Sequence, residues 1–209
     1  MTFSSREDAG RQLAEDLVQR DLQVDLIVGL PRGGVVVAAE VAHALHKPLD
    51  VLVVRKIGHP RHREYGIGAI AEGGVVLLHQ DAIRESFVSK DELDEVIAEE
   101  NQTLANYRAR FHEASLYVKG KRVILVDDGI ATGATTEVAV KAARKLGATS
   151  IIVAAPVAST SAYHHLSRVA DEVIALLIDP GFMAVGQYYD EFDQTTDEEV
   201  IALLHAPTV

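Results

Sequence analysis

The stretch Val123-Ile-Leu-Val-Asp127-Asp128-Gly-Ile-Ala-Thr132-Gly133-Ala-Thr135-Thr136 decides how the chain folds. Its four apolar residues predict a buried strand, two acids end that strand, and a turn of small residues leads into a helix near Ala134. The turn and the helix start leave backbone N–H groups unpaired, and together with the helix dipole these form a site for an anion such as phosphate. Carboxylates at the carboxyl end of a strand suit sugar hydroxyls or a magnesium-bound ligand.

Further apolar runs of strand length alternate with helical patterns, which predicts an α/β fold: a parallel sheet of about five strands flanked by helices. The candidate strands are 26–30, 49–54, 75–78, 123–126, 151–155 and 173–178. The candidate helices are 6–19, 35–45, 90–111, 134–146 and 162–169, with a short one that starts near Thr196. We expect residues 1–209 to form a single domain, with a core over about 21–178 and a small C-terminal hood over about 179–209.

The charge of the chain limits its partners. It has 20 Lys and Arg against 31 Asp and Glu, a formal charge of −11, which disfavours non-specific binding to nucleic acid or to an anionic membrane. The absence of cysteine excludes disulfides, thiolate metal sites and cysteine nucleophiles. Because the sequence shows neither a signal-peptide pattern nor an apolar run of spanning length, we expect a cytoplasmic protein that binds small molecules.

A second strand, glycine-rich turn and helix lies at Leu26-Ile-Val-Gly29-Leu-Pro31-Arg32-Gly33-Gly34 and predicts another anion site, now with an arginine beside it. Residues 55–63, RKIGHPRHR, carry four positive charges without an acid. This composition suits a mobile lid over an anion, and the alternative is a solvated surface loop. The acidic face of the 90–111 helix, which includes Glu99, is expected to be a solvated surface.

Two other nucleotide-binding motifs do not fit the sequence. A Walker A loop needs a lysine after its second glycine, whereas Gly133 is followed by Ala134. The run Gly66-Ile-Gly68-Ala-Ile-Ala71 has the spacing of a dinucleotide fingerprint, but it follows a charged segment and opens no helix, so we interpret it as a chance match.

The VILVDDGIATGATT stretch resembles the phosphoribosyl pyrophosphate (PRPP) motif of type I phosphoribosyltransferases. The resemblance implies that Asp127 and Asp128 bind the ribose 2′- and 3′-hydroxyls and that the loop after them holds the 5′-phosphate. The implied PRPP-binding residues are Asp127, Asp128, Ala131, Thr132, Gly133, Ala134, Thr135 and Thr136. Mg²⁺ is the implied cofactor, held mainly through PRPP in the neighbourhood of the two acids.

The loop after the first strand is similar to the family's pyrophosphate loop, which in many members carries a cis peptide that Gly33 or Gly34 would tolerate. The implied pyrophosphate-binding residues are Pro31, Arg32, Gly33, Gly34, Arg55 and Lys56. Asp127, Asp128, Arg55 and Lys56 are the implied catalytic residues, since the two cations would neutralise the leaving pyrophosphate.

The segment PGFMAVGQYYD, residues 180–190, loosely resembles the hood of the 6-oxopurine members. That resemblance would make Phe182 stack on the acceptor base, with Tyr188, Tyr189 and Asp190 nearby, whereas the alternative is an aromatic plug that packs the hood onto the core. Ala131 stands where the 6-oxopurine members have a base-deprotonating aspartate and matches the adenine-type members. The acceptor therefore stays open, and no general base is assigned.

The resemblance implies an enzyme that transfers ribose 5-phosphate from Mg-PRPP to a nitrogen of a heterocyclic, purine-like acceptor and releases pyrophosphate. The alternative is a non-catalytic sensor of PRPP or a nucleotide on the same fold. Such a sensor usually needs a nucleic-acid-binding surface, which the acidic balance and the lack of an appended helix-turn-helix pattern disfavour. A homodimer is compatible with this fold, in which a lid can borrow contacts from a neighbour.

Overall fold

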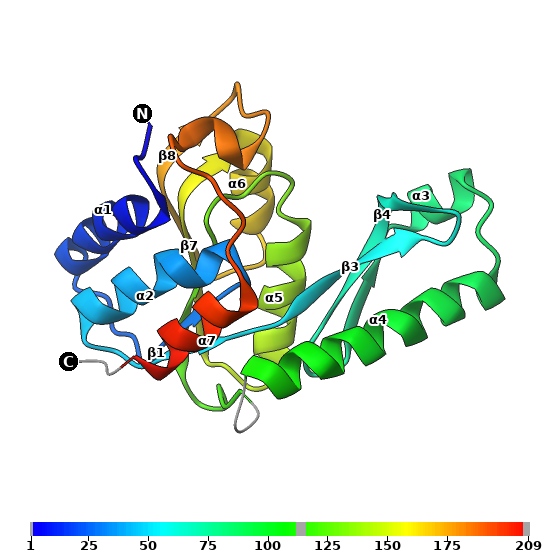
Figure 1. Ribbon diagram of the computed structural model, residues 1–209, viewed down its shortest axis with the longest axis horizontal. Coiled ribbons are helices and arrows are strands. Elements are labelled where there is room, and N and C mark those ends of the chain that lie inside the picture. Colours follow the sequence, from blue (N-terminus) through cyan, green and yellow to red (C-terminus); the bar gives the residue numbers. More distant parts are fainter. Residues whose placement is uncertain (1, 112–115, 207–209) are drawn as a thin grey trace.

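The structure, a computed structural model, has a parallel sheet at its centre and describes residues 2–111 and 116–206, so the last three residues of the predicted hood lie outside the described part. Five parallel strands form this sheet (Figure 1). Their order is β2 (Leu49–Val51), β1 (Leu26–Gly29), β6 (Arg122–Val126), β7 (Ser150–Ser159) and β8 (Glu172–Asp179). The predicted five-stranded α/β fold is confirmed.

Helices cover both faces of this sheet, which explains the continuous apolar runs of its strands. On one face, alternate strand residues such as Ile27 and Ile124 pack against α1 (Arg6–Gln19) and α2 (Gly33–Leu45). On the other face, Val28 and Leu125 pack against α5 (Ala134–Lys145) and α6 (Thr160–Leu166). Both faces are therefore buried, and the carboxyl ends of the strands are left for a site.

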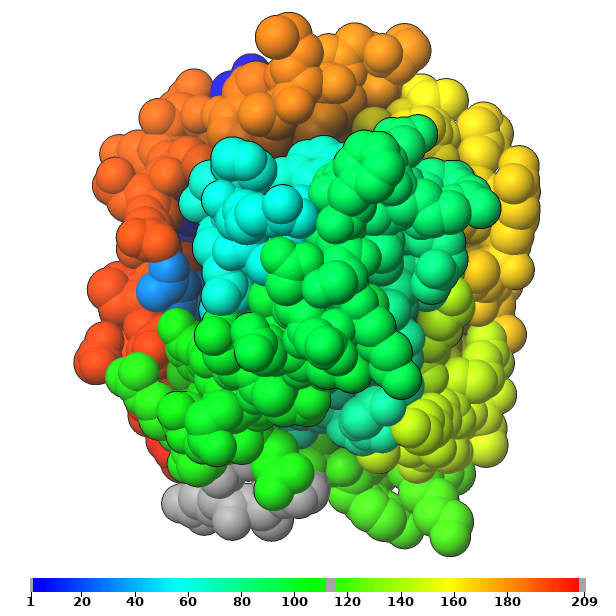
Figure 2. Space-filling model, turned by 90° about the vertical axis from the view of Figure 1, so that its right-hand side faces the viewer, coloured from blue at the N-terminus to red at the C-terminus, as the bar shows by residue number. Residues whose placement is uncertain are grey.

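Residues between β2 and β6 build an arm that the sequence did not predict. Strands β3 (Val54–His59), β4 (His62–Ala71) and β5 (Val75–Leu78) form a separate antiparallel sheet, followed by α3 (Gln80–Glu85) and the long α4 (Lys90–Phe111). The arm projects from the core in Figure 1 and faces the viewer, cyan to green, in Figure 2. In its apolar cluster Ile57 and Ile67 meet Val96 and Leu104 of α4, and the same cluster continues into α2 and β2.

Two expectations change in the arm, and a third is supported. Residues 75–78 form a strand as predicted, but it belongs to the antiparallel sheet. The basic segment 55–63 forms the β3–β4 hairpin, because β4 supplies a partner strand for it. Residues 66–71 lie inside β4, which agrees with reading the glycine pattern there as a chance match.

The C-terminal segment closes the carboxyl edge of the sheet. It contains a short 3-10 helix, η1 (Val185–Tyr188), and α7 (Asp197–His205), which packs on α2 and α4. Reciprocal capping bonds precede two helices, between Ser89 and Glu92 at the start of α4 and between Thr196 and Glu199 at the start of α7. Within the described residues, none of the helices combines the length and apolar character that crossing a membrane requires.

Candidate active site

The two acids of the central motif lie at the carboxyl end of β6 and are largely shielded from solvent. Burial raises the pKa of Asp127 well above its usual range, and the neighbouring Asp128 carboxylate adds to this rise. Burial also raises the pKa of Asp128, while the guanidinium of Arg6, whose Nε lies 2.7 Å from Asp128 Oδ2, opposes the rise. The pair therefore favours ligands that bring positive charge or hydrogen-bond donors, such as sugar hydroxyls.

The glycine-rich loop after β1 lies directly against these acids because it has no side chains there. A Cβ on Gly33 would lie 2.0 Å from Asp128 Oδ2, and one on Gly34 would lie 2.8 Å from the carbonyl oxygen of Val126. The peptide between Pro31 and Arg32 is cis, one position before the glycines at which we expected it. The start of α2 and the two acids thus lie in direct contact, which brings together the two motifs that the sequence analysis described separately.

The second anion site is the loop that leads into α5. Gly133 is the N-cap of α5 and has a φ of 77°, a left-handed conformation that glycine adopts without a steric penalty. The side chains of Thr132 and Thr135 face solvent, whereas Thr136 is buried. The free N–H groups of this helix start, with two exposed hydroxyls beside them, suit a phosphate group.

The predicted cations divide between two places. Arg32 and Arg55 line one pocket of about 300 Å³, together with Pro31, Tyr107 and Phe111. Lys56 does not line this pocket. It lies in a neighbouring groove of the arm beside Glu64, to whose backbone carbonyl oxygen its ammonium group donates at 3.3 Å. Arg55 lines this groove as well as the pocket, so the structure brings Arg32 and Arg55 together and places Lys56 beside Arg55 but outside the pocket.

The sequence of the chain matches that of a known protein family. The model of the phosphoribosyl transferase domain matches residues 4–189 of the chain. The chain belongs to the phosphoribosyltransferase family. Its five-stranded parallel sheet flanked by helices is the type I phosphoribosyltransferase fold.

Individual relatives support this membership. A Mycobacterium tuberculosis protein, provisionally named a phosphoribosyl transferase, is 43% identical over 204 residues, which are 97% of this chain and 46% of that protein. The chain thus spans about half the length of the curated relatives it matches. The crystal structure of TT1426 from Thermus thermophilus is 42% identical, covers 98% of both chains and superposes with a TM-score of 0.79. A ribose-phosphate pyrophosphokinase of Thermococcus kodakarensis is 38% identical over 76 residues, 35% of this chain and 27% of that protein.

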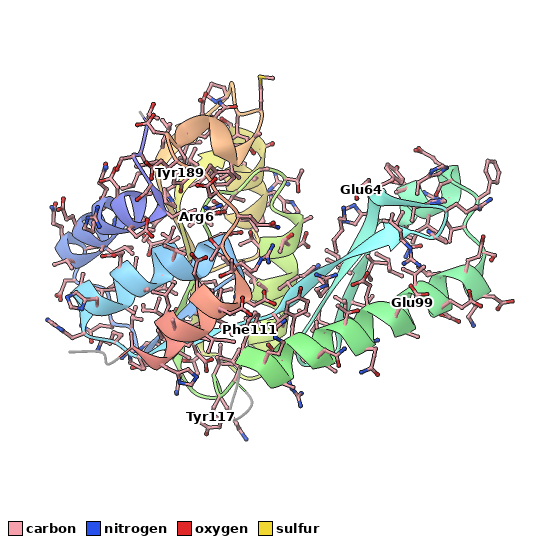
Figure 3. All side chains as sticks on the ribbon, in the orientation of Figure 1. Arg6, Glu64, Glu99, Phe111, Tyr117 and Tyr189 are labelled. Carbon is pink, nitrogen blue, oxygen red and sulfur yellow. The ribbon has the colours of Figure 1, made fainter. Side chains whose placement is uncertain are left out.

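Two cations of the basic 55–63 hairpin are paired with carboxylates of α4. Arg55 Nε donates to Glu100 at 3.2 Å, and Arg63 donates to Glu99 at 2.6 Å. Figure 3 shows Glu64 and Glu99 on the arm, away from the core. The acidic face of α4, which we expected to be solvated, therefore carries the partners of the basic hairpin.

Arg32 has its partner in the C-terminal helix. Its Nη1 lies 3.6 Å from Oδ1 of Asp197, a buried residue at the start of α7. The other carboxylate oxygen of Asp197 accepts a hydrogen bond from Arg110 at 2.6 Å, while Oδ1 has no hydrogen-bond partner among the described residues. The predicted pyrophosphate loop is thus linked through Asp197 to α4, a connection that the sequence analysis did not anticipate.

The aromatic residues of the hood differ in their exposure. Tyr188 and Tyr189 are 4% and 6% exposed, and their hydroxyls donate to Asp179 at 2.7 Å and to the backbone oxygen of Asp128 at 2.6 Å. Their burial favours the aromatic plug over direct stacking on an acceptor. Phe182 is half-buried against Tyr188, and Asp190 is exposed, so these two retain surface for a ligand.

Arg6 is a site residue that the sequence analysis missed. We expected the 6–19 helix only to pack, yet the first residue of α1 reaches Asp128, 122 positions along the chain. Nothing near Arg6 in the sequence distinguishes it from the exposed Arg11 on the same helix. Only the fold, which places α1 beside the carboxyl ends of the strands, reveals the contact.

Proposed function

We propose that the protein transfers ribose 5-phosphate from Mg-PRPP to a nitrogen of a heterocyclic acceptor and releases pyrophosphate. One observation carries this proposal: the glycine loop that begins α2 lies directly against Asp127 and Asp128, which the next loop joins to the start of α5. The order of these parts matches the order of groups in PRPP: one anion site for pyrophosphate, two carboxylates for ribose and a second anion site for the 5′-phosphate.

The chain's own residues would act mainly by positioning and charge neutralisation. Asp127 and Asp128 would accept hydrogen bonds from the ribose hydroxyls, and the N–H groups from Gly133 to Thr135 would hold the 5′-phosphate. Arg32 would stabilise the charge that develops on the leaving pyrophosphate, which is the electrostatic help that a dissociating, oxocarbenium-like transition state needs. Closure of the site would keep water from the activated ribose.

Arg55 and Lys56 would also bind the pyrophosphate, and each would exchange its present partner on the arm for a phosphate oxygen. Arg55 already lines the same pocket as Arg32, and its pairing with Glu100 would be exchanged for the pyrophosphate oxygens. Lys56 lies further away and would need a movement of the β3–β4 hairpin. The exchange of carboxylates for phosphate oxygens keeps each cation neutralised before and after binding.

The acids at the end of β6 fit a supporting role for magnesium. Adjacent carboxylates are suitable Mg²⁺ ligands, but the described residues contain no group of three His, Asp or Glu side chains that would bind an ion by themselves. Bound Mg²⁺ would supply further neutralisation of the pyrophosphate charge. It would be held mainly by PRPP oxygens, with Asp127 and Asp128 as the nearest protein groups.

The acceptor would enter below the hood. Phe182 keeps part of its ring accessible, and Asp190 lies close by in the sequence with an exposed side chain, so we propose these two as acceptor contacts. Tyr188 and Tyr189 would hold the hood in place behind them. No described side chain stands out as a general base, because Ala131 occupies the position where some relatives carry an acid.

The proposal is tested by binding and turnover. The double variant Asp127→Asn with Asp128→Asn should lose PRPP binding in isothermal titration calorimetry while remaining folded by circular dichroism. Release of pyrophosphate from PRPP should be followed with a panel of purines and pyrimidines. Unchanged PRPP binding by the double variant would show that the site assignment is wrong, and binding without any turnover would favour a sensor.

A further inference from the structure

Asp128 is held at two separate points by residues that are remote in the sequence. Its carboxylate accepts a hydrogen bond from Arg6 Nε at 2.7 Å, and its backbone oxygen accepts one from the Tyr189 hydroxyl at 2.6 Å. Arg6 begins α1, whereas Tyr189 follows η1 in the hood. The side chain and the backbone of one predicted ribose-binding residue are therefore fixed independently.

A third residue joins the two holding side chains. The guanidinium carbon of Arg6 lies 4.0 Å from the ring centroid of Phe192, and the Tyr189 ring stacks on the same Phe192 ring with centroids 5.1 Å apart and planes inclined by 30°. Arg6 also donates from Nη1 to the carbonyl oxygen of Asp193 at 2.7 Å. Figure 3 shows Arg6 and Tyr189 next to one another on the core. Asp128, Arg6, Phe192 and Tyr189 thus form a closed ring of contacts.

The ring of contacts is shielded from solvent where it meets Asp128. The Arg6 side chain is 12% exposed and that of Asp128 15%. Low exposure limits the competition of water for these hydrogen bonds and restricts the rotamers of both side chains. An ordinary surface ion pair would lack both properties, as the exposed Arg11 with its 3.9 Å contacts illustrates.

We propose that Arg6, Phe192 and Tyr189 form a clamp that positions Asp128 to receive the ribose hydroxyls of PRPP, an inference that rests on the proposed function. Binding groups act efficiently only when neighbouring contacts hold their geometry. Arg6 and Tyr189 are then positioning residues, since they act on the substrate through Asp128. The clamp gives Tyr189, which we had expected near the acceptor, a defined role at the ribose.

The clamp predicts a selective loss of affinity. Tyr189→Phe keeps the stacked ring and removes the hydroxyl, and it should weaken Mg-PRPP binding by about three- to tenfold, in line with one lost hydrogen bond. Arg6→Gln removes a charged donor and should weaken it by about ten- to a hundredfold, with partial recovery in Arg6→Lys. Mg-pyrophosphate, which lacks ribose, should bind all variants within about twofold of the unaltered protein.

The measurement is calorimetric titration with Mg-PRPP and Mg-pyrophosphate, with thermal melting as a check of folding. Arg11→Gln, on the same helix, should leave both affinities unchanged. Tyr188→Phe removes the neighbouring hydroxyl, which bonds to Asp179, and should weaken PRPP binding less than Tyr189→Phe does. In the double variant of Arg6→Gln with Tyr189→Phe, the fold-loss of PRPP affinity should be smaller than the product of the two single losses, because both side chains act on Asp128.

Each outcome decides between the alternatives. If the unaltered protein fails to bind Mg-PRPP, the proposed function is wrong and the clamp falls with it. If that protein binds Mg-PRPP but Arg6→Gln and Tyr189→Phe bind it equally well, only the clamp is refuted. Equal weakening of PRPP and pyrophosphate in both variants would also refute it, because it would indicate general disruption.

Discussion

Gly33→Ala is a sharp test of how the site is packed. A Cβ at this position would lie 2.0 Å from Asp128 Oδ2 and 2.6 Å from Arg6 Nε. To restore ordinary contact, the carboxylate oxygen would have to move by about 1.4 Å and the guanidinium nitrogen by about 0.8 Å. Overpacking of this kind costs about 1–3 kcal/mol, and loss of the charged hydrogen bond between Arg6 and Asp128 costs about 1.5–3 kcal/mol. Because alanine has a higher helix propensity than glycine, the substitution at the start of α2 would offset at most about 1 kcal/mol of this cost.

We therefore expect Gly33→Ala to lower the free energy of unfolding by about 2–4 kcal/mol and to weaken Mg-PRPP binding at least tenfold. Urea denaturation and calorimetric titration measure the two effects. Gly66→Ala is the matched control, because the nearest atom to its Cβ, Lys56 Cδ, is at an ordinary 3.4 Å. A Gly33→Ala variant that gains stability from alanine and binds PRPP normally would show that the loop does not press against Asp128.

Three other predictions concern charged pairs. Glu100→Gln frees Arg55 and should tighten Mg-pyrophosphate binding by about two- to fivefold in calorimetric titration; weaker binding would mean that Glu100 orients Arg55 productively. Asp197→Asn removes the buried partner of the half-exposed Arg110 and should lower the free energy of unfolding by about 1–2 kcal/mol in urea denaturation, with no change speaking against that ion pair. Hydrogen bonds from Arg122 lower the pKa of Asp25. The stability that ionised Asp25 contributes is therefore present above about pH 4 and is lost as the pH falls. Asp25→Asn should therefore flatten the acid limb of a stability–pH curve, and an unchanged slope would exclude this contribution.

The parallel core was predictable because its signals are local. The apolar runs that became β1, β6 and β7 are buried on both faces, so each is uniformly apolar over its central residues. Both loops of the site follow such a strand directly. Because the carboxyl ends of parallel strands meet at one edge, the sequence was enough to bring Asp127 and Gly33 into one site.

The arm was not predictable because its signals depend on remote partners. Strand β4 is exposed over its charged first half and buried over its second half, which is rich in small residues, so it shows no strand period from end to end. It becomes a strand only when β3 and β5 pair with it on either side. The ion pairs of Arg55 with Glu100 and Arg63 with Glu99 span 45 and 36 residues and leave no mark at either position alone.

Residues ahead of α1 meet the segment after η1 beside the site, and this affects when the site forms during synthesis. Phe3 forms a parallel bridge with Tyr189 and donates from its N–H to the backbone oxygen of Tyr188 at 2.8 Å. A nascent chain that has left the ribosome only as far as α6 would already contain both carboxylates, Arg6 and both predicted anion-binding loops. It would lack Tyr188 and Tyr189, which hold Phe3 and the backbone of Asp128. Closing so long a loop is one of the slower steps of folding. The chain would thus become able to bind its ligand only late in translation. Removal of a few residues ahead of α1 would delay or weaken this binding.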